Sequence, residues 1–408
     1  MPRRFSLHQF DNGLTLCMEH MPQAISSAVG FVVRTGARNE EAKLDGVSHF
    51  LEHMMFKGTH KRGWLEINRD FDLMGARYNA FTSWEETCYY AWVLNEEVPR
   101  ALELLSDMLA PTLPPEEFNT EKKVILEEIA QYEDMPQQVV FEEAMRVAFS
   151  GHRLSSNIIG SPKTVKRMTR DEMLAYFQRR YTPANIVLFA CGNIDEPRLI
   201  ADVERLWAGR GGPAAPTDVT TPAFHPGRRI LQKKDVARQH VILLWPSLGM
   251  SDRRSVAASI LGAIYGDEKN SRLYWALRHT GLAEEASGGY FGFSDTGVIA
   301  AQAACDPDKA QKVSGILQQE ARRLRKGIQK TELERARNRA RTAVVLSAET
   351  PFERFRQLMQ EYLARREFLT TDEMLARIAS VSLKDLYALL EEFPLDKRCV
   401  LTSLGPKR

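Results

Sequence analysis

Three residues near position 50 have the types and the spacing that metal chemistry requires. His49 and His53 are four residues apart, and residues at that spacing lie on one face of an α-helix, one turn apart. Two imidazoles held in this way can bind a single metal ion, and Glu52, three residues after His49, shares their face. Hydrolytic zinc sites combine neutral imidazole ligands, an open coordination position and a base that takes a proton from water. The spacing therefore predicts a zinc site with Glu52 close to the water.

Two histidines do not complete a catalytic zinc site, so a third ligand has to come from elsewhere in the chain. The segment 115–132 is predicted to be a long helix and carries Glu121 and Glu128, seven residues apart and on nearly the same face. One carboxylate could ligate the metal while the other orients a ligand histidine. Glu127 points about 100° away from Glu128 and is the weaker candidate. Spacing alone leaves the assignment of the two acids open.

The histidine motif is short, and two histidines on an amphipathic helix can also be half-buried polar residues without a ligand. The segments around the motif are more specific. Residues 46–59 (GVSHFLEHMMFKGT), 78–83 (YNAFTS), 86–91 (ETCYYA) and 121–128 (EKKVILEE) carry the resemblance. They are similar to the pitrilysin family of inverzincin zinc metallopeptidases, particularly its mitochondrial processing peptidase branch. The resemblance covers nearly the whole chain and is strongest over residues 5–200.

The resemblance implies a role for each residue of the motif. It implies that His49, His53 and Glu128 ligate zinc, with one ion per chain. Glu52 would be the general base, and Glu121 would be the supporting acid beside a ligand.

The resemblance also implies where substrate binds. Asn79, Ala80 and Phe81 match the edge strand along which family members align a peptide. This agrees with elementary physics, because an extended peptide can add a strand to a sheet edge through main-chain hydrogen bonds. In the second half of the chain, Arg278 matches a substrate-holding arginine of the family, but Glu284 stands where a tyrosine is expected. A carboxylate cannot donate a hydrogen bond to a developing oxyanion unless it is protonated.

The second half has no metal site of its own, and the resemblance implies a partner chain. The helix expected at 255–265 (SVAASILGAIY) contains neither histidine nor acid. Longer family members enclose peptides in a chamber of four such units, whereas this chain has two. The partner would be either a second copy or a metal-free homologous subunit that supplies the arginine and the tyrosine.

The elements around these residues suggest a duplicated α+β fold. With 408 residues, 44% hydrophobic and 26% charged, the chain suits two globular domains. Residues 209–222 are rich in Gly, Pro and Thr, so we predict a first domain at 1–208, a linker at 209–229 and a second domain at 230–408. The order of predicted strands and helices recurs after the linker. Each domain is therefore predicted to be an antiparallel sheet packed against helices.

Charge and hydropathy exclude other classes of protein. A net charge of +2 gives no overall attraction to nucleic acid, and the basic run at 322–341 is interrupted by Glu332 and Glu334. No run of eighteen apolar residues would span a membrane, and no leader segment is visible, so a cytoplasmic location is expected.

The sequence thus predicts a zinc endopeptidase that cleaves short or unfolded peptides in a chamber formed with a second chain. The alternative is a non-catalytic structural subunit of a larger complex, like the core proteins of the respiratory cytochrome complex. Glu284 is the observation that favours this alternative.

Overall fold

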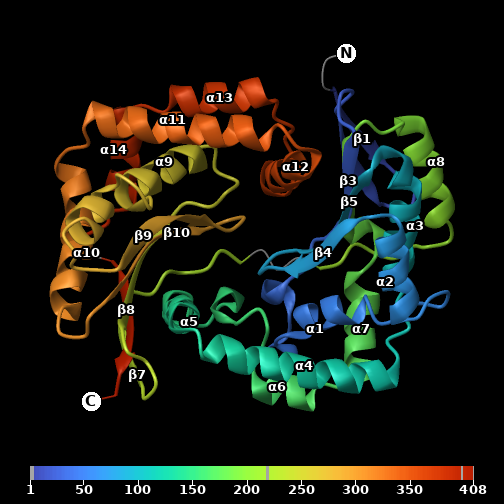
Figure 1. Cartoon of the computed structure of the whole chain (residues 1–408), viewed down its shortest axis with the longest axis horizontal. Helices are drawn as coiled ribbons and strands as arrows, with labels where there is room; N and C mark the ends of the chain where they lie inside the picture. The colour runs from blue at the N-terminus through green and yellow to red at the C-terminus, as the bar shows by residue number, and fades with distance from the viewer. Residues whose placement is uncertain (1–3, 217–219, 397, 408) are drawn as a thin grey trace. The chain divides into compact units, whose positions relative to one another are not determined.

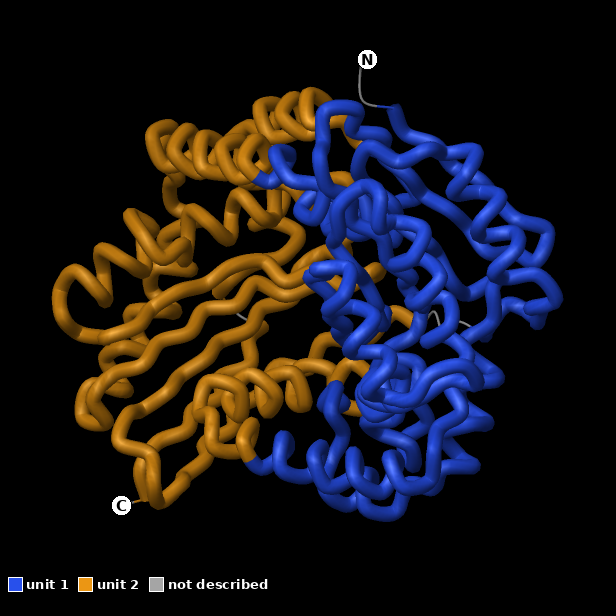
Figure 2. Tube along the Cα trace, turned by 45° about the vertical axis from the view of Figure 1, so that its right-hand side comes forward, with its two compact units in different colours: residues 1–130, 156–219, 347–368 blue, residues 131–155, 220–346, 369–408 orange. Residues whose placement is uncertain are grey.

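The computed structural model describes residues 4–216, 220–396 and 398–407 (Figure 1). The chain forms two compact units, each assembled from three separate segments (Figure 2). Unit 1 contains residues 1–130, 156–219 and 347–368, and unit 2 contains residues 131–155, 220–346 and 369–408. Each unit therefore takes one segment from the opposite half of the sequence. The predicted boundaries around a 209–229 linker stay a prediction, and residues 217–219 of that linker lie outside the described ranges.

Unit 1 is built on one six-stranded sheet. Its strands are β1 (Arg4–Gln9), β2 (Thr15–His20), β3 (Ser26–Val33), β4 (Arg77–Thr82), β5 (Thr87–Leu94) and β6 (Ile186–Gly192). Its helices are α1 (Val47–Met54), α2 (Trp64–Leu73), α3 (Val98–Met108), most of α4 (Pro115–Glu133), α6 (Pro162–Arg167), α7 (Arg170–Arg180), α8 (Glu196–Leu206) and α12 (Pro351–Arg365). The strand order is β1-β2-β6-β3-β5-β4, and neighbours are antiparallel except for the parallel pair β2–β6. Strand β4 is the last strand of this sheet.

Helix α12 comes from the second half of the sequence and covers one face of the unit 1 sheet. Its residues Phe355, Leu358 and Tyr362 pack with buried side chains of β2, β3 and β6. Arg354 forms an ion pair with Glu19 of β2, 335 positions away, and their side chains are only 4% and 0% exposed. A buried ion pair adds little net stability, but separating its charges is costly. The pair therefore fixes where α12 sits on the sheet.

Unit 2 repeats this plan with a five-stranded sheet. Its strands are β7 (Gly227–Lys233), β8 (Gln239–Ser247), β9 (Glu285–Gly292), β10 (Gly297–Cys305) and β11 (Val400–Pro406), in the order β7-β11-β8-β10-β9. Its helices are α5 (Pro136–Ala148), α9 (Ser255–Gly266), α10 (Ala310–Lys326), α11 (Lys330–Ser347), α13 (Thr371–Ser380) and α14 (Leu383–Glu392), with a π-helical turn at Tyr274–Arg278. Helix α5, from the first half of the sequence, packs on β7, β8 and β11. The predicted α+β fold with two sheet-and-helix units is confirmed, and each sheet is antiparallel apart from one parallel pair.

Helix α9 packs on the last strand of its sheet, β9, as α1 packs on β4 in unit 1. Its approach is so close that two of its residues have to be glycine. A Cβ atom on Gly262 would lie 2.7 Å from the backbone nitrogen of Tyr290, and one on Gly266 would lie 2.4 Å from Cα of Gly288. At these two positions no side chain fits between the helix and the strand. The contact between helix and last strand thus serves packing in unit 2, whereas in unit 1 the corresponding helix carries the histidines.

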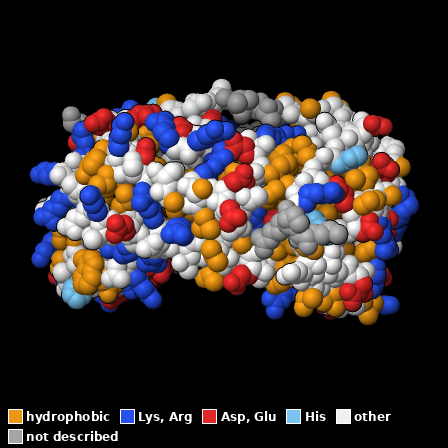
Figure 3. Space-filling model, turned by 90° about the horizontal axis from the view of Figure 1, so that it is seen from above, with side chains coloured by type: hydrophobic (Ala, Val, Ile, Leu, Met, Phe, Trp, Pro, Cys, Tyr) orange, Lys and Arg blue, Asp and Glu red, His pale blue; other side chains and the backbone are white. Residues whose placement is uncertain are grey.

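Charged side chains of both signs share the face of the molecule that Figure 3 shows. On the face shown in Figure 3, Lys and Arg side chains are interspersed with Asp, Glu and apolar side chains. The arginines of the basic run at 322–341 are largely paired, for example Arg323 with Glu320, Arg325 with Asp396 and Arg339 with Asp267. Among the helices of the described ranges, none has both the length and the apolar character needed to cross a bilayer.

The contact between α9 and β9 predicts that Gly262→Ala destabilises unit 2. Replacing glycine by alanine inside a helix normally stabilises it by roughly 0.5–1 kcal/mol. At Gly262 the new methyl would meet strand backbone, so we expect a loss of about 1–3 kcal/mol instead. The control is Gly315→Ala in the exposed middle of α10, where a Cβ meets no atom within 4 Å and should raise the unfolding temperature slightly. Unfolding temperatures that change alike in the two variants would contradict this account.

Candidate metal centre

Helix α1 carries the histidine motif, and its start is fixed by two unusual residues. Gly46 precedes the helix with φ 92°, a left-handed conformation that favours glycine. The carboxylate of Glu40 accepts hydrogen bonds from the backbone N–H groups of Gly46 and Ser48, both at 2.8 Å. It therefore caps the helix from outside, because these N–H groups have no partner within the helix. The Ser48 hydroxyl shares a hydrogen bond of 2.8 Å with Tyr176 of α7.

Helix α4 brings the acidic residues to α1. It begins at Pro115, a residue that suits the first turn because its missing N–H would have no helical partner. Its buried residues Phe118, Ile125 and Ile129 recur at helical spacing, and the rings of Phe118 and Phe50 stack at 4.7 Å. This packing sets α4 against the helix that carries the histidines.

The structure brings His49, His53 and Glu128 together. One potential ligand atom from each lies within 4.8 Å of the other two. Nε2 of His49 is 3.6 Å and Nε2 of His53 is 3.7 Å from Oε2 of Glu128. These distances are too long for hydrogen bonds but close to the about 3.4 Å that separates two ligands of a tetrahedral zinc ion with bonds of about 2.05 Å. The donor atoms and their spacing therefore fit zinc.

The protonation state of His49 also suits a metal ligand. Burial, together with the nearby charge of His53, lowers the pKa of His49 to about 3. Its imidazole is therefore neutral near pH 7, as metal binding requires.

Glu121 lies beside this group and contacts the other ring nitrogen of His53. Its Oε2 is 3.0 Å from His53 Nδ1, and its Oε1 is 2.5 Å from Nζ of Lys57. Burial alone would raise the pKa of Glu121, but hydrogen bonds with His53 and Lys57 outweigh it and lower that pKa. An ionised carboxylate at Nδ1 holds the ring so that Nε2 faces Glu128.

Glu52 links the metal group to the sheet edge. Its Oε2 accepts a hydrogen bond of 2.6 Å from the hydroxyl of Thr82, the last residue of β4. Burial raises the pKa of Glu52, so the carboxyl can hold a proton more readily than an exposed glutamate does. The bond to Thr82 leaves Oε1 to exchange a proton with a neighbouring molecule.

The predicted substrate residues Asn79, Ala80 and Phe81 all lie in β4. They pair on one side with Tyr90, Tyr89 and Cys88 of β5, and the sheet ends on the other side. Backbone groups on that side are placed to pair with an added strand.

Arg278 and Glu284 lie in unit 2, whereas the metal group lies in unit 1. Arg278 donates a hydrogen bond of 3.1 Å to the carbonyl of Glu268, and its guanidinium lies over the ring of Tyr274. Glu284 forms an ion pair with Arg238. Within unit 2, both side chains thus have local partners.

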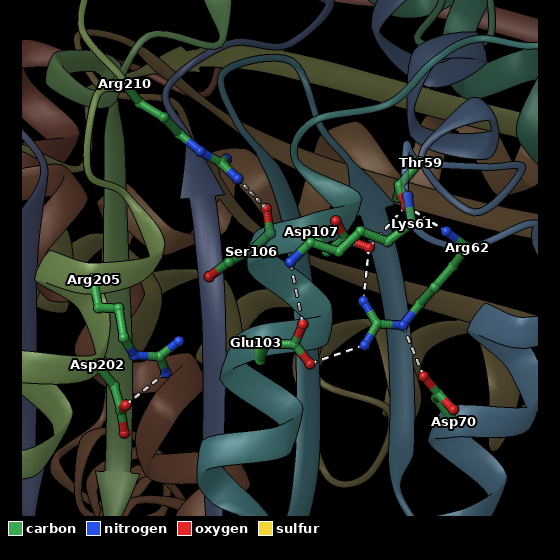
Figure 4. A network of polar contacts seen from close by, with 10 residues as sticks. All are labelled: Thr59, Lys61, Arg62, Asp70, Glu103, Ser106, Asp107, Asp202, Arg205 and Arg210. Carbon is green, nitrogen blue, oxygen red and sulfur yellow. Dashed lines mark hydrogen bonds and ion pairs between the residues drawn. The ribbon is translucent and has the colours of Figure 1, made fainter.

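The loop after α1 is held by a network of polar contacts (Figure 4). Arg62 contacts Asp70, Glu103 and Asp107 at 2.8–2.9 Å, and the hydroxyl of Thr59 donates to Asp107 at 2.8 Å. Burial alone would lower the pKa of Arg62, but its hydrogen bonds to Glu103, Asp107 and Asp70 raise that pKa, so the guanidinium stays charged. The network ties the end of the motif segment to α2 and α3.

Three residues of the site were not predicted from the sequence: Glu40, Lys57 and Thr82. Lys57 follows His53 by four residues, so helical spacing could have placed it beside Glu121. Nothing in the sequence signals that Glu40 caps α1, or that Thr82 reaches Glu52.

The chain matches two family descriptions over most of its length. Residues 15–162 match insulinase (peptidase family M16), and residues 167–340 match the peptidase M16 inactive domain. It is 32% identical over 404 residues to an uncharacterized zinc protease of Streptomyces coelicolor, covering 97% of this chain and 88% of that protein. It is 31% identical over 384 residues to an uncharacterized zinc protease of Bacillus subtilis, covering 93% of each.

Solved structures share the fold at low sequence identity. A protease from Helicobacter pylori superposes with a TM-score of 0.92 at 20% identity, covering 99% of this chain and 100% of that one. A peptidase M16 inactive domain from Pseudomonas fluorescens superposes with a TM-score of 0.90 at 16% identity, covering 99% and 98%.

The cap on α1 predicts a pH dependence of stability. Burial raises the pKa of Glu40 to about 7, although hydrogen bonds from Ser48 and Gly46 favour the ionised form. This pKa lies above the value of about 4.3 for an unfolded glutamate, so the folded protein binds the proton more tightly than the unfolded chain does. The stability that Glu40 contributes is therefore fully present below about pH 4.3 and is lost as the pH rises through about 7. In metal-free protein, the stability of the wild type relative to Glu40→Gln should fall by about 2–3 kcal/mol from pH 5 to pH 8.

Urea unfolding curves at the two pH values, recorded with a chelator present, measure this difference. Glu41→Gln is the control, since Glu41 is the next residue and is exposed. Parallel stability profiles for the wild type and Glu40→Gln would show that Glu40 does not titrate in this range.

Proposed function

The chain belongs to peptidase family M16, and from that premise we propose that it is a zinc-dependent endopeptidase that hydrolyses short or unfolded peptides. The observation that carries the proposal is the convergence of His49, His53 and Glu128, with Glu52 hydrogen-bonded to the sheet edge. The similarity to zinc proteases of Streptomyces coelicolor and Bacillus subtilis supports it.

In this proposal His49, His53 and Glu128 hold one zinc ion, and Glu121 orients His53. Zinc supplies a Lewis acid that polarises a carbonyl and makes water acidic near neutral pH. Glu52 accepts the proton of the attacking water at Oε1 and returns it to the leaving amine. Its buried position and raised pKa suit both the uptake of the proton from water and its release to the amine.

The substrate would bind as an added strand along β4. Main-chain hydrogen bonds to alternate residues along the edge formed by Asn79, Ala80 and Phe81 would hold an extended peptide, largely independent of its sequence. The N–H of Ala80, which donates to Oδ1 of Asn79 at 2.9 Å, would exchange that bond for one to the peptide. Thr82, at the end of the same strand, fixes Glu52, so one short element would position both the scissile bond and the base.

A second chain would complete the chamber. Unit 2 carries no ligand set like that of α1 among its described residues, and Glu284 is engaged by Arg238. A partner subunit that supplies an arginine and a tyrosine would provide the oxyanion support that Glu284 cannot give. The partner is either a second copy or a metal-free homologue, and Glu284 favours the homologue. Arg278 would act as a substrate contact.

The proposal predicts that Glu52→Gln abolishes cleavage without loss of zinc. Removing a general base typically costs about 10²–10⁴-fold in rate, and the amide cannot take the proton. Cleavage of a mixed pool of unfolded peptides and zinc content per chain are measured together. His53→Ala should lose both zinc and cleavage. Glu127→Gln, an exposed neighbour of Glu128, is the matched control and should retain both.

Two results would contradict the proposal. If Glu52→Gln cleaves as fast as the wild type, Glu52 is not the base. If the wild-type chain binds no zinc and is inert with every homologous partner tested, the non-catalytic structural subunit becomes the better account.

A further inference from the structure

The two faces of β4 carry different side chains. Successive residues of a strand point to opposite faces of the sheet. Tyr78 and Ala80 pack against the core on the side of α1, and Thr82 reaches Glu52 on that side. Phe81 instead packs against the side chains that face α12. A peptide added beside β4 would alternate in the same way between the two faces.

Aromatic side chains gather on the α12 face next to this edge. Phe81, Tyr90, Trp92 and Phe352 form what we call the aromatic shelf, and each is only partly buried. The ring of Phe352 lies 4.9 Å from that of Tyr90 and stacks on Trp92 at 5.8 Å with an angle of 10°. The four rings come from β4, β5 and the start of α12, so the fold joins residues about 270 positions apart.

The shelf is in register with the open edge. Trp92 is paired with Arg77 and Tyr90 with Asn79, and both of these β4 residues are exposed. The guanidinium of Arg77 lies 5.5 Å from the centre of the Trp92 ring. A side chain of an added strand that points to this face would extend the row formed by these pairs, at the spacing of cross-strand neighbours.

We propose that the aromatic shelf binds apolar side chains of the peptide substrate, namely those of every second residue that point away from the metal group. This inference rests on the proposed function and adds a substrate class to it. The preferred substrates are unfolded segments in which large apolar residues alternate with other residues, the pattern of buried β-strands. Main-chain bonds to β4 give affinity for any extended peptide, and the shelf supplies the preference.

The alternation of side chains along a strand favours an extended peptide as the ligand of the aromatic shelf. A helix or a flat apolar surface would place its side chains without regard to the pleat of β4, whereas an added strand delivers one side chain to the shelf for each one on the metal side. Phe81 lies on the edge strand β4, and Tyr90 and Trp92 lie on the neighbouring strand β5. Because Thr82 of β4 also anchors Glu52, peptide residues held along this edge would flank the scissile bond.

Binding to the Glu52→Gln chain tests the proposal without relying on turnover. The probes are two labelled nine-residue peptides of Ser and Gln, one with Phe at every second position and one with Ala there. We expect the Phe peptide to bind more tightly. Phe352→Ala, made in the same chain, should weaken the Phe peptide by about 3–10-fold and leave the Ala peptide unchanged, as expected for the loss of aromatic contacts.

Phe368→Ala is the matched control. Phe368 belongs to the same α12 face but stacks on Phe5 of β1, at the opposite edge of the sheet. It should not alter the ratio of the two affinities. Phe352→Leu keeps an apolar side chain and should fall between the wild type and Phe352→Ala; unfolding temperatures establish that the variants are folded.

The outcomes separate the shelf from the catalytic proposal. Equal affinities for the two peptides, or a Phe352→Ala effect that is the same for both, would overturn the shelf even if the wild type cleaves peptides. Absence of any peptide binding would overturn the shelf together with strand addition. A preserved Phe preference in a chain without zinc or cleavage would support the shelf and count against the peptidase.

Discussion

The site depends on holding a helix of only eight residues in one position. A helix this short is not stable alone, so its place has to come from contacts with the rest of the fold. Glu40 caps its start, and Phe50 packs on α4. Glu121 of α4 contacts His53 in the last turn and Lys57 just beyond the end of the helix. These contacts hold the helix so that His49 and His53, one turn apart, both face the carboxylate of Glu128 on α4.

The two units use the same contact, between a helix and the last strand of the sheet, for different purposes. Helices α1 and α9 each pack on the last strand of a sheet. In unit 1 the helix presents histidines beside that strand, and Thr82 of the strand holds Glu52. In unit 2, Gly262 and Gly266 bring the helix backbone against the strand, so a metal-ligating side chain at either position would clash with that strand. The reciprocal exchange of α5 and α12 ties each unit to the other half of the sequence, and the buried Arg354–Glu19 pair fixes α12.

The sequence was sufficient to predict which residues lie close together where the helical repeat alone places them on one face. It placed His49, Glu52 and His53 on one helix face, and the two acids on one face of a second helix. It could not tell from spacing which acid lies with the histidines, because that depends on how the two helices pack. The exchanged helices, the cap by Glu40 and the bond from Thr82 to Glu52 were missed, since they join segments whose approach only the tertiary fold determines. The same holds for the aromatic shelf, in which Phe352 meets strands near residue 90.

The most direct test of the central claim is a crystal structure of the zinc-loaded chain with anomalous diffraction at the zinc edge. Our account predicts one zinc peak bound to Nε2 of His49, Nε2 of His53 and a carboxylate oxygen of Glu128 at about 2.0–2.2 Å. Glu121 should remain on Nδ1 of His53. A zinc ion bound by Glu121 instead of Glu128, or bound away from α1, would contradict the account.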